Sequence, residues 1–217
     1  MNLGPEINGL VASLNGNNIP LVWMPELGVG YYPVDDSDSP YDAAYFAKYV
    51  QYENTPIGRA INAFRVDLVS KHIGSDQLVD IGIGSGAFIK ARGRNTVGYD
   101  INPESLRWLA EQGMLWDNPE NGVVNASFWD SLEHLPNPGE MVRHRQVVFV
   151  SLPIFEDFNH VLRSKHFRKT EHRWYWTRAG LINWFSGMGF ACVERNTEET
   201  RIGREDIETF VFAKVRH

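Results

Sequence analysis

The chain has 217 residues, 43% of them hydrophobic and 22% charged, and a formal net charge of −6, which suits one globular domain with an addition, or two small domains. It shows no secretory signal and no apolar run near the roughly 18 residues of a membrane span, and its single cysteine, Cys192, excludes an intrachain disulfide and a cysteine-based zinc site. We therefore expect a cytoplasmic protein without a membrane partner, and the acidic charge makes nucleic acid an unlikely partner because phosphate binding needs clustered cations.

Residues 1–75 are predicted to form an N-terminal extension and two helices. Residues 1–40 are rich in Gly, Asn, Pro and Asp, which indicates an extended or loosely ordered lead-in. Ser39-Pro40 is typical of a helix start, and Thr55-Pro56 starts a second helix that extends to about His72. The first helix carries a stripe of tyrosines that we interpret as a packing surface: Tyr41, Tyr45, Tyr49 and Tyr52. Placed before the first strand of an α/β unit, both helices would cover its ligand crevice.

From residue 76 to 217 strands alternate with helices, which predicts an α/β, Rossmann-like domain. We expect a seven-stranded, mostly parallel sheet with helices on both faces. Its strands are predicted at about 77–82, 96–99, 114–116 (very short), 122–128, 146–152, 190–196 and 208–215. Residues 197–207 contain no helix signal, so the last strand should pair antiparallel with the one before it. Residues 153–176 form an insertion dense in histidine, arginine and aromatic residues.

A glycine-rich turn follows the first strand of this domain. It reads Asp80-Ile81-Gly82-Ile83-Gly84-Ser85-Gly86, and a second acid, Asp100, ends the next strand. Glycines let a ligand approach the backbone, the turn directs helix amides at it, and the second acid can bind ribose hydroxyls. A P-loop is excluded because no Gly-Lys-Ser/Thr closes the turn, whereas a dinucleotide fingerprint is formally satisfied. Because Asp80 would attract an ammonium group and repel a pyrophosphate, the turn favours a nucleoside that carries a cationic amino acid.

The glycine turn, together with Gly98-Tyr99-Asp100-Ile101-Asn102-Pro103, resembles class I S-adenosylmethionine-dependent methyltransferases. The block from Phe128 to Pro138, which contains Leu132-Glu133-His134, is similar to the segment after strand four in small-molecule members such as those of ubiquinone biosynthesis. The resemblance implies S-adenosyl-L-methionine as cofactor, with Asp100 at the ribose and Ile101 at the adenine. The cofactor-binding positions that it implies are Asp80, Gly82, Gly84, Gly86, Asp100, Ile101, Trp116, Asp117, Phe128 and Trp129.

Methyl transfer requires chiefly that acceptor and methyl group are aligned, and a general base helps when the acceptor is a hydroxyl or a protonated amine. His134 and His172 are the candidate bases, and Asp130 would lie near the methyl group. Asp130, Glu133 and His134 could also gather a divalent cation, since spacings of three and four share one side of a helical turn. The same residue types occur in many relatives without a metal, so we expect no metal.

The function that we expect is therefore methyl transfer to an oxygen or nitrogen of a small-molecule acceptor. One alternative is methylation of a nucleic acid or a protein. A second is a cofactor-binding regulatory protein without transferase activity, and a third is a nicotinamide-dependent oxidoreductase, because the dinucleotide fingerprint is formally present.

Overall fold

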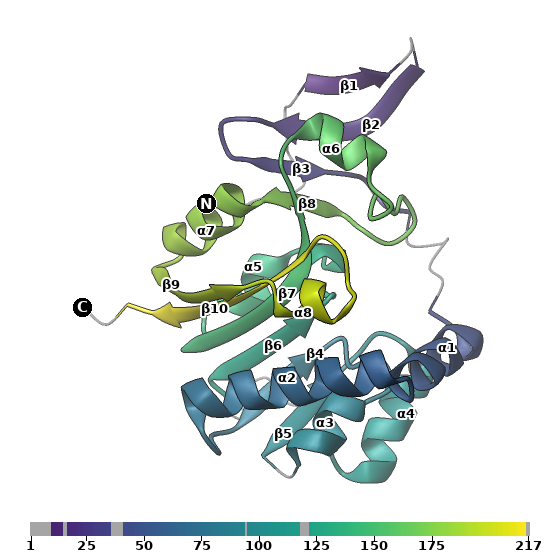
Figure 1. Ribbon diagram of the computed structural model, residues 1–217, viewed down its shortest axis with the longest axis vertical. Helices are drawn as coiled ribbons and strands as arrows, with labels where there is room; N and C mark the ends of the chain where they lie inside the picture. The colour runs from purple at the N-terminus through teal and green to yellow at the C-terminus, as the bar shows by residue number, and fades with distance from the viewer. Residues whose placement is uncertain (1–9, 15–16, 36–40, 94, 118–121, 216–217) are drawn as a thin grey trace.

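The computed structural model describes residues 10–14, 17–35, 41–93, 95–117 and 122–215, which form a mixed α/β structure (Figure 1). The helix start predicted at Ser39 lies outside the described residues. Asp42 instead caps the first helix, α1 (Ala43–Glu53), by accepting a hydrogen bond from the Tyr45 amide at 2.8 Å.

The main sheet has the strand order β5-β4-β6-β7-β10-β9. Its strands are β4 (Leu78–Ile81), β5 (Thr96–Tyr99), β6 (Asn125–Trp129), β7 (Val147–Phe155), β9 (Phe190–Asn196) and β10 (Ile207–Lys214). The pairs among β5, β4, β6 and β7 are parallel, and β10 runs antiparallel to both of its neighbours. The Rossmann-like fold and the antiparallel last strand are thereby confirmed. The very short strand predicted at 114–116 is reduced among the described residues to one bridge between Leu115 and Gly98.

A second, smaller sheet extends the first and was not predicted. It consists of β1 (Leu10–Leu14), β2 (Asn17–Met24), β3 (Val29–Tyr31) and β8 (Trp174–Thr177), paired antiparallel in that order. The end of β7 runs parallel to β8 and joins the two sheets. Of the two alternatives predicted for the lead-in, the extended one therefore agrees with these N-terminal strands and the loosely ordered one does not. Strand β3 pairs with β8, which lies in the insertion, and no local sequence pattern predicts a pairing between segments so far apart in the chain.

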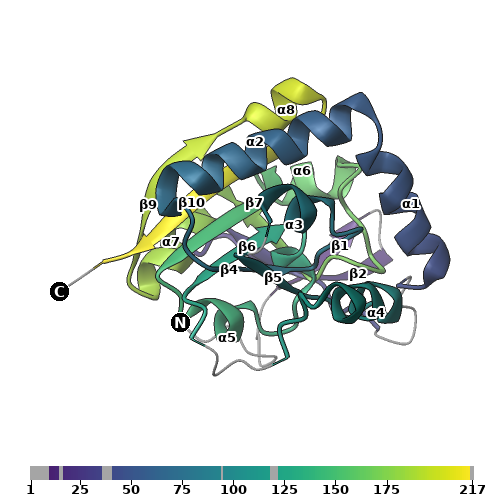
Figure 2. The same cartoon turned by 90° about the horizontal axis from the view of Figure 1, so that it is seen from below.

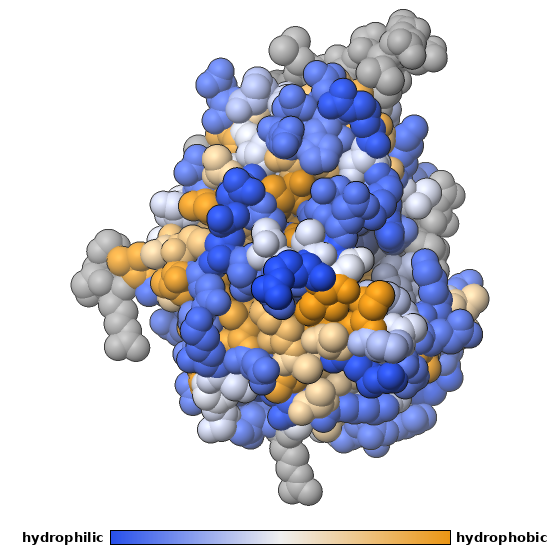
Figure 3. Space-filling model, viewed as in Figure 1, coloured by the Kyte–Doolittle hydropathy of each residue, from blue (hydrophilic) through white to orange (hydrophobic). Residues whose placement is uncertain are grey.

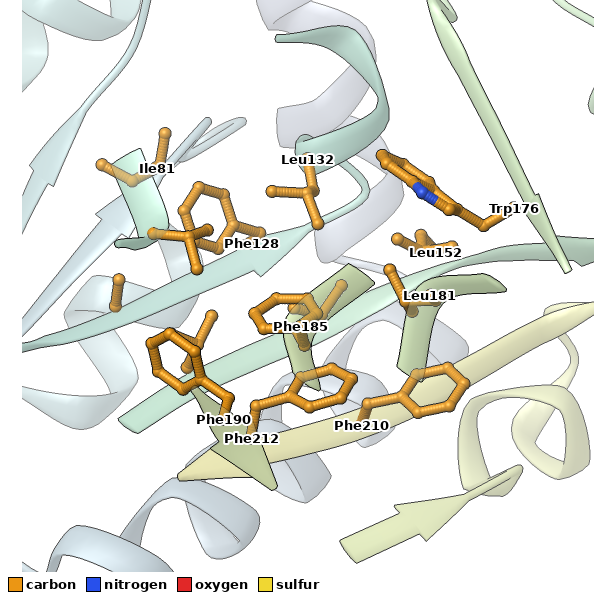
Figure 4. Close-up of a cluster of buried hydrophobic side chains, with 14 of the residues drawn as sticks. Ile81, Phe128, Leu132, Leu152, Trp176, Leu181, Phe185, Phe190, Phe210 and Phe212 are labelled. Carbon is orange, nitrogen blue, oxygen red and sulfur yellow. The ribbon is translucent and has the colours of Figure 1, made fainter. Parts of the chain in front are cut away.

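Helices cover both faces of the main sheet (Figures 1 and 2). One face packs against α2 (Pro56–Ile73), α3 (Ala87–Arg92) and α4 (Pro103–Gln112), the other against α5 (Pro138–Val142) and α7 (Arg178–Gly187). On the side of α5 and α7, Phe185 of α7 stacks on Phe212 of β10 with ring centroids 3.7 Å apart (Figure 4). Thr55 and Thr177 cap α2 and α7 through their side chains, and the start of α2 agrees with the prediction.

Two short helices lie in segments where none was expected. Helix α6 (Phe158–Arg163) belongs to the insertion, and α8 (Glu198–Ile202) contradicts the prediction that 197–207 contains no helix. The carboxylate of Glu199 in α8 is fully buried and accepts hydrogen bonds from Arg65, Arg204 and Ser151. Tertiary ion pairs therefore hold this helix, which is too short to show a helical periodicity in the sequence.

The face shown in Figure 3 is largely hydrophilic, with hydrophobic residues showing mainly in its middle, over α2 and α8. Within the described part of the chain, no helix combines the length and apolar character that crossing a membrane requires.

Candidate active site

A cavity of about 360 Å³ lies at the carboxyl ends of β4, β5 and β6. Open α/β sheets bind ligands at this edge. Its walls come from the glycine turn, from α1 and the start of α2, from the end of β6 and from the insertion. In Figures 1 and 2, α1 lies at the same end of the molecule as the start of α4, which follows β5. Residues that are distant in the sequence thus line the same cavity.

The glycine turn has a left-handed backbone at all three glycines. Their φ angles are +80° for Gly82, +56° for Gly84 and +78° for Gly86. A Cβ on Gly82 or Gly86 would collide with Ser131 or with the ring of Trp108, so these two glycines are required by the packing behind the turn. A Cβ on Gly84 would meet its nearest atom only at 3.4 Å, and Gly84 lines the cavity. It is therefore the glycine placed to let a ligand approach the backbone.

Three carboxyl groups face this end of the cavity. Asp80 is 1% exposed and accepts a hydrogen bond from Ser127 at 2.6 Å, and burial raises its pKa to about 7. Burial also raises the pKa of Asp100, which accepts a hydrogen bond from the Asn102 amide at 2.9 Å. Glu53, at the end of α1, has a pKa raised by burial to about 7. A cationic ligand would offset the cost of burying three negative charges.

Glu53 is a site residue that the sequence did not indicate. It lies on α1, before the glycine turn in the chain, and its Oε2 atom is buried without a hydrogen-bond partner among the described residues. Nothing in the local pattern of α1 distinguishes Glu53 from a surface acid. Only the packing of α1 against the turn brings this carboxylate within 4 Å of a Cβ placed on Gly84.

The remaining residues predicted for cofactor binding fall into two groups. Ile101 and Trp129 line the cavity. The side chain of Ile101 is 57% exposed, so it is accessible to an adenine ring. Phe128 points instead into the hydrophobic core (Figure 4). Trp116 is buried with Arg145 over its ring at 5.0 Å, and Asp117 is exposed. None of these last three residues lines the cavity.

Asp130, a predicted catalytic residue, is held by two guanidinium groups. Its Oδ2 lies 2.6 Å from Arg204 and 3.4 Å from Arg65. Burial opposes ionisation of this carboxyl, but the two arginines outweigh it and hold its pKa below its usual range. Although Asp130 lines the cavity, these ion pairs leave it a weak proton acceptor.

His134 and His172, the predicted bases, are in contact. Their ring centroids are 4.7 Å apart, and both rings line the cavity. Tyr41 lies within hydrogen-bond distance of His134, with 2.7 Å between Oη and Nδ1. Burial lowers the pKa of His134 to about 4 and that of His172 well below its ordinary value. Both rings are therefore neutral at neutral pH, with a lone pair available for a proton or a cation.

The tyrosine stripe of α1 faces the cavity, so its interpretation as a packing surface was wrong. The Tyr45 hydroxyl donates to Glu171 of the insertion at 3.0 Å and lies 3.1 Å from the Tyr49 hydroxyl. Glu171 in turn lies 3.4 Å from Arg168. These contacts connect α1 to the insertion over the cavity. The helical spacing of the tyrosines was correct, but spacing does not tell whether a stripe meets core or ligand.

Comparison with known families identifies the class of protein. A family model described as "Methyltransferase domain" matches residues 46–195. Because the match covers more than half of the chain, the chain belongs to this family. It is a class I S-adenosylmethionine-dependent methyltransferase, which confirms the resemblance seen in the sequence.

Solved structures support the fold. The magnesium protoporphyrin IX methyltransferase of Synechocystis PCC 6803 with bound S-adenosylhomocysteine has a TM-score of 0.58 at 12% identity, over 81% of this chain and 96% of that one. A methyltransferase of Clostridium acetobutylicum ATCC 824 gives 0.56 at 11% identity, over 79% and 99%. The 1,6-didemethyltoxoflavin-N1-methyltransferase of Burkholderia thailandensis gives 0.51 at 13% identity, over 80% and 85%. A search of curated protein sequences finds no match.

The cofactor of this class is S-adenosylmethionine, and the cavity fits it. The open side of Gly84 provides the backbone approach that the ligand needs. Buried carboxyl groups at Asp80 and Glu53 suit a ligand with ammonium and sulfonium charges, and Asp100 is placed to accept hydrogen bonds from a ribose. When bound, the cofactor supplies a methyl group that is activated by the sulfonium.

Proposed function

We propose that the protein transfers the methyl group of S-adenosylmethionine to an oxygen or nitrogen of a small-molecule acceptor. One observation carries this proposal: six of the ten residues predicted to bind the cofactor, among them Asp80, Gly84 and Asp100, line one cavity with aromatic, histidine and charged side chains of α1 and the insertion. The volume of about 360 Å³ lies in the range of small-molecule sites.

The relatives and the electrostatics favour the same class of acceptor. Magnesium protoporphyrin IX and 1,6-didemethyltoxoflavin, which two of the similar structures carry in their names, are small molecules. The net charge of −6 disfavours a phosphate backbone as partner. Because α1 and the insertion meet over the cavity, a compact acceptor fits this site better than a polymer.

Within this proposal each wall has its own task. Asp100 would bind the ribose hydroxyls, and Asp80 would face the cationic amino-acid part. The opposite wall, with Tyr45 and Glu171, would hold the acceptor by hydrogen bonds that replace those the two side chains now make with each other. His134 would lie between the two walls, where it can receive a proton from the acceptor or help to hold a cation that acidifies it.

The test is formation of S-adenosylhomocysteine when the enzyme receives S-adenosylmethionine and fractions of a cell extract. We expect turnover with the small-molecule fraction and none with nucleic acid or protein. Turnover with a macromolecular fraction alone would overturn the proposal, and so would tight cofactor binding without turnover on any fraction. Tyr45→Phe is a useful variant, because it should raise the KM of the acceptor and leave the affinity for S-adenosylhomocysteine unchanged.

A further inference from the structure

We propose that Glu133, His134 and His172 form a site for one divalent transition-metal ion, with Zn²⁺ as the best-suited ion, in the wall of the cavity. The sequence led us to expect no metal, and it grouped Glu133 and His134 with Asp130. In the structure Asp130 forms ion pairs with Arg65 and Arg204, and the third member of the cluster is His172 from the insertion.

The three side chains converge. Each offers one ligand atom, and these atoms lie within 4.8 Å of one another, so one ion could contact all three. Glu133 and His134 belong to the short helix η2 (Leu132–His134), and His172 comes just before β8. The Arg173 amide donates to the carbonyl of Glu133 at 2.8 Å. This backbone bond fixes the two segments against each other, so the cluster is part of the fold.

The cluster contains buried polar atoms without partners. Glu133 is 1% exposed, and neither of its carboxylate oxygens has a hydrogen-bond partner among the described residues. The same holds for Nδ1 of His172, which is 4% exposed. Buried carboxylates are ordinarily paired or bound to a metal, because removing the charge from water is costly. Nε2 of His134 lies 3.9 Å from Oε1 of Glu133, too far for a hydrogen bond.

The hydrogen bond of His134 leaves the correct nitrogen free. Tyr41 lies 2.7 Å from Nδ1. When Nδ1 carries the proton and donates it to the tyrosine oxygen, Nε2 keeps its lone pair on the side of Glu133. Metal-binding histidines are commonly oriented by such a bond from the other ring nitrogen. Tyr41 thus acts as a positioning residue for His134.

The ligand set indicates the type of ion. Two imidazoles and one carboxylate suit Zn²⁺ and its transition-metal neighbours, whereas Mg²⁺ and Ca²⁺ prefer oxygen ligands alone. Three protein ligands leave a coordination position open, and because His134 and His172 line the cavity this position faces it.

The role of the ion rests on the proposed function. An ion at this position would bind an acceptor hydroxyl and lower its pKa, so that the hydroxyl loses its proton more readily. The acceptor's proton would pass to solvent and its oxygen would bond the methyl carbon, while the electron pair of the broken bond stays on sulfur. The site therefore favours acceptors with an ionisable hydroxyl group.

The test is a calorimetric titration with ZnCl₂. The protein is first treated with a chelator, and the titration is carried out with a competing chelator present and without cofactor or acceptor. We expect saturation at one ion per chain. Glu133→Gln and His172→Gln should each weaken binding about 100-fold or more, because even loss of an outer partner costs 10–100-fold. His144→Gln, which removes an exposed histidine that does not belong to the cluster, should bind the ion as the unaltered protein does.

Tyr41→Phe provides a milder variant that should fold in any case. It removes only the hydroxyl that orients His134 and should weaken binding about 10-fold. Absence of saturable binding, or equal affinity in the unaltered protein, Glu133→Gln and His172→Gln, would overturn the metal site. Binding of S-adenosylhomocysteine, measured separately, distinguishes this failure from a failure of the proposed function, since the metal titration involves neither cofactor nor acceptor.

Discussion

Replacement of Asp80 by asparagine tests the electrostatic design of the cavity. The carboxyl group is 1% exposed, and burial raises its pKa from 3.8 to about 7. This difference corresponds to about 4 kcal/mol, the cost of keeping the buried group ionised above pH 7. Asparagine has the same shape and can still accept the hydrogen bond from Ser127. We therefore expect Asp80→Asn to raise the free energy of unfolding of the ligand-free protein at pH 8 by up to about 4 kcal/mol.

The direction of the pH dependence follows from the same pKa values. Between about pH 4 and pH 7 the folded protein retains the Asp80 proton more tightly than the unfolded chain does. The contribution of Asp80 to the stability of the unaltered protein therefore falls as the pH rises through this window and levels off above it. Glu53 titrates in the same window, so the quantity to follow is the difference between the protein and its variant. That difference should be near zero at pH 4 and largest at pH 8.

Urea unfolding at pH 4 and pH 8, with and without S-adenosylhomocysteine, measures both effects. The variant should gain stability without ligand and lose at least about tenfold in cofactor affinity, since a charge-assisted contact contributes roughly 1.5–3 kcal/mol. Equal stability of both proteins at pH 8 would refute the desolvation argument. Unchanged cofactor affinity in the folded variant would refute the role of Asp80 at the ammonium group.

Three further substitutions have controls elsewhere in the chain. Gly86→Ala should lower the free energy of unfolding in urea by more than about 2 kcal/mol, because it adds a clash with the ring of Trp108 to the strain of a left-handed backbone. Gly113 also has a left-handed backbone but lies in open space, so Gly113→Ala should cost only about 1 kcal/mol. Equal effects would contradict the packing account. Arg204→Met should cost about 3–5 kcal/mol, because it removes one of the two guanidinium groups that pair with Asp130 and the buried Glu199, and Arg201→Met, at an exposed pair, less than about 1 kcal/mol. Asp100→Asn should weaken S-adenosylhomocysteine binding about 10–100-fold in calorimetry, and undiminished affinity would exclude a ribose contact.

Local chemistry determined much of the fold. The helix after Thr55 begins where its capping residue predicts, and β5 and β9 have the expected bounds. The reason is that caps, glycine ends and buried apolar runs act within a few residues of each other. The glycine turn likewise predicted one end of the cavity, where we propose that the cofactor binds, because its backbone requirement depends on consecutive positions.

Tertiary structure alone decided how the distant parts of the site combine. The sequence marked His134 and His172 separately, but only the docking of the insertion on η2 shows that their rings touch beside a buried Glu133. Glu53 and the tyrosines of α1 look like an ordinary amphipathic helix until α1 lies over the turn. Long-range strand pairing, buried ion pairs and the direction in which a side chain faces depend on segments far apart in the chain, and local residue patterns carry no information on them.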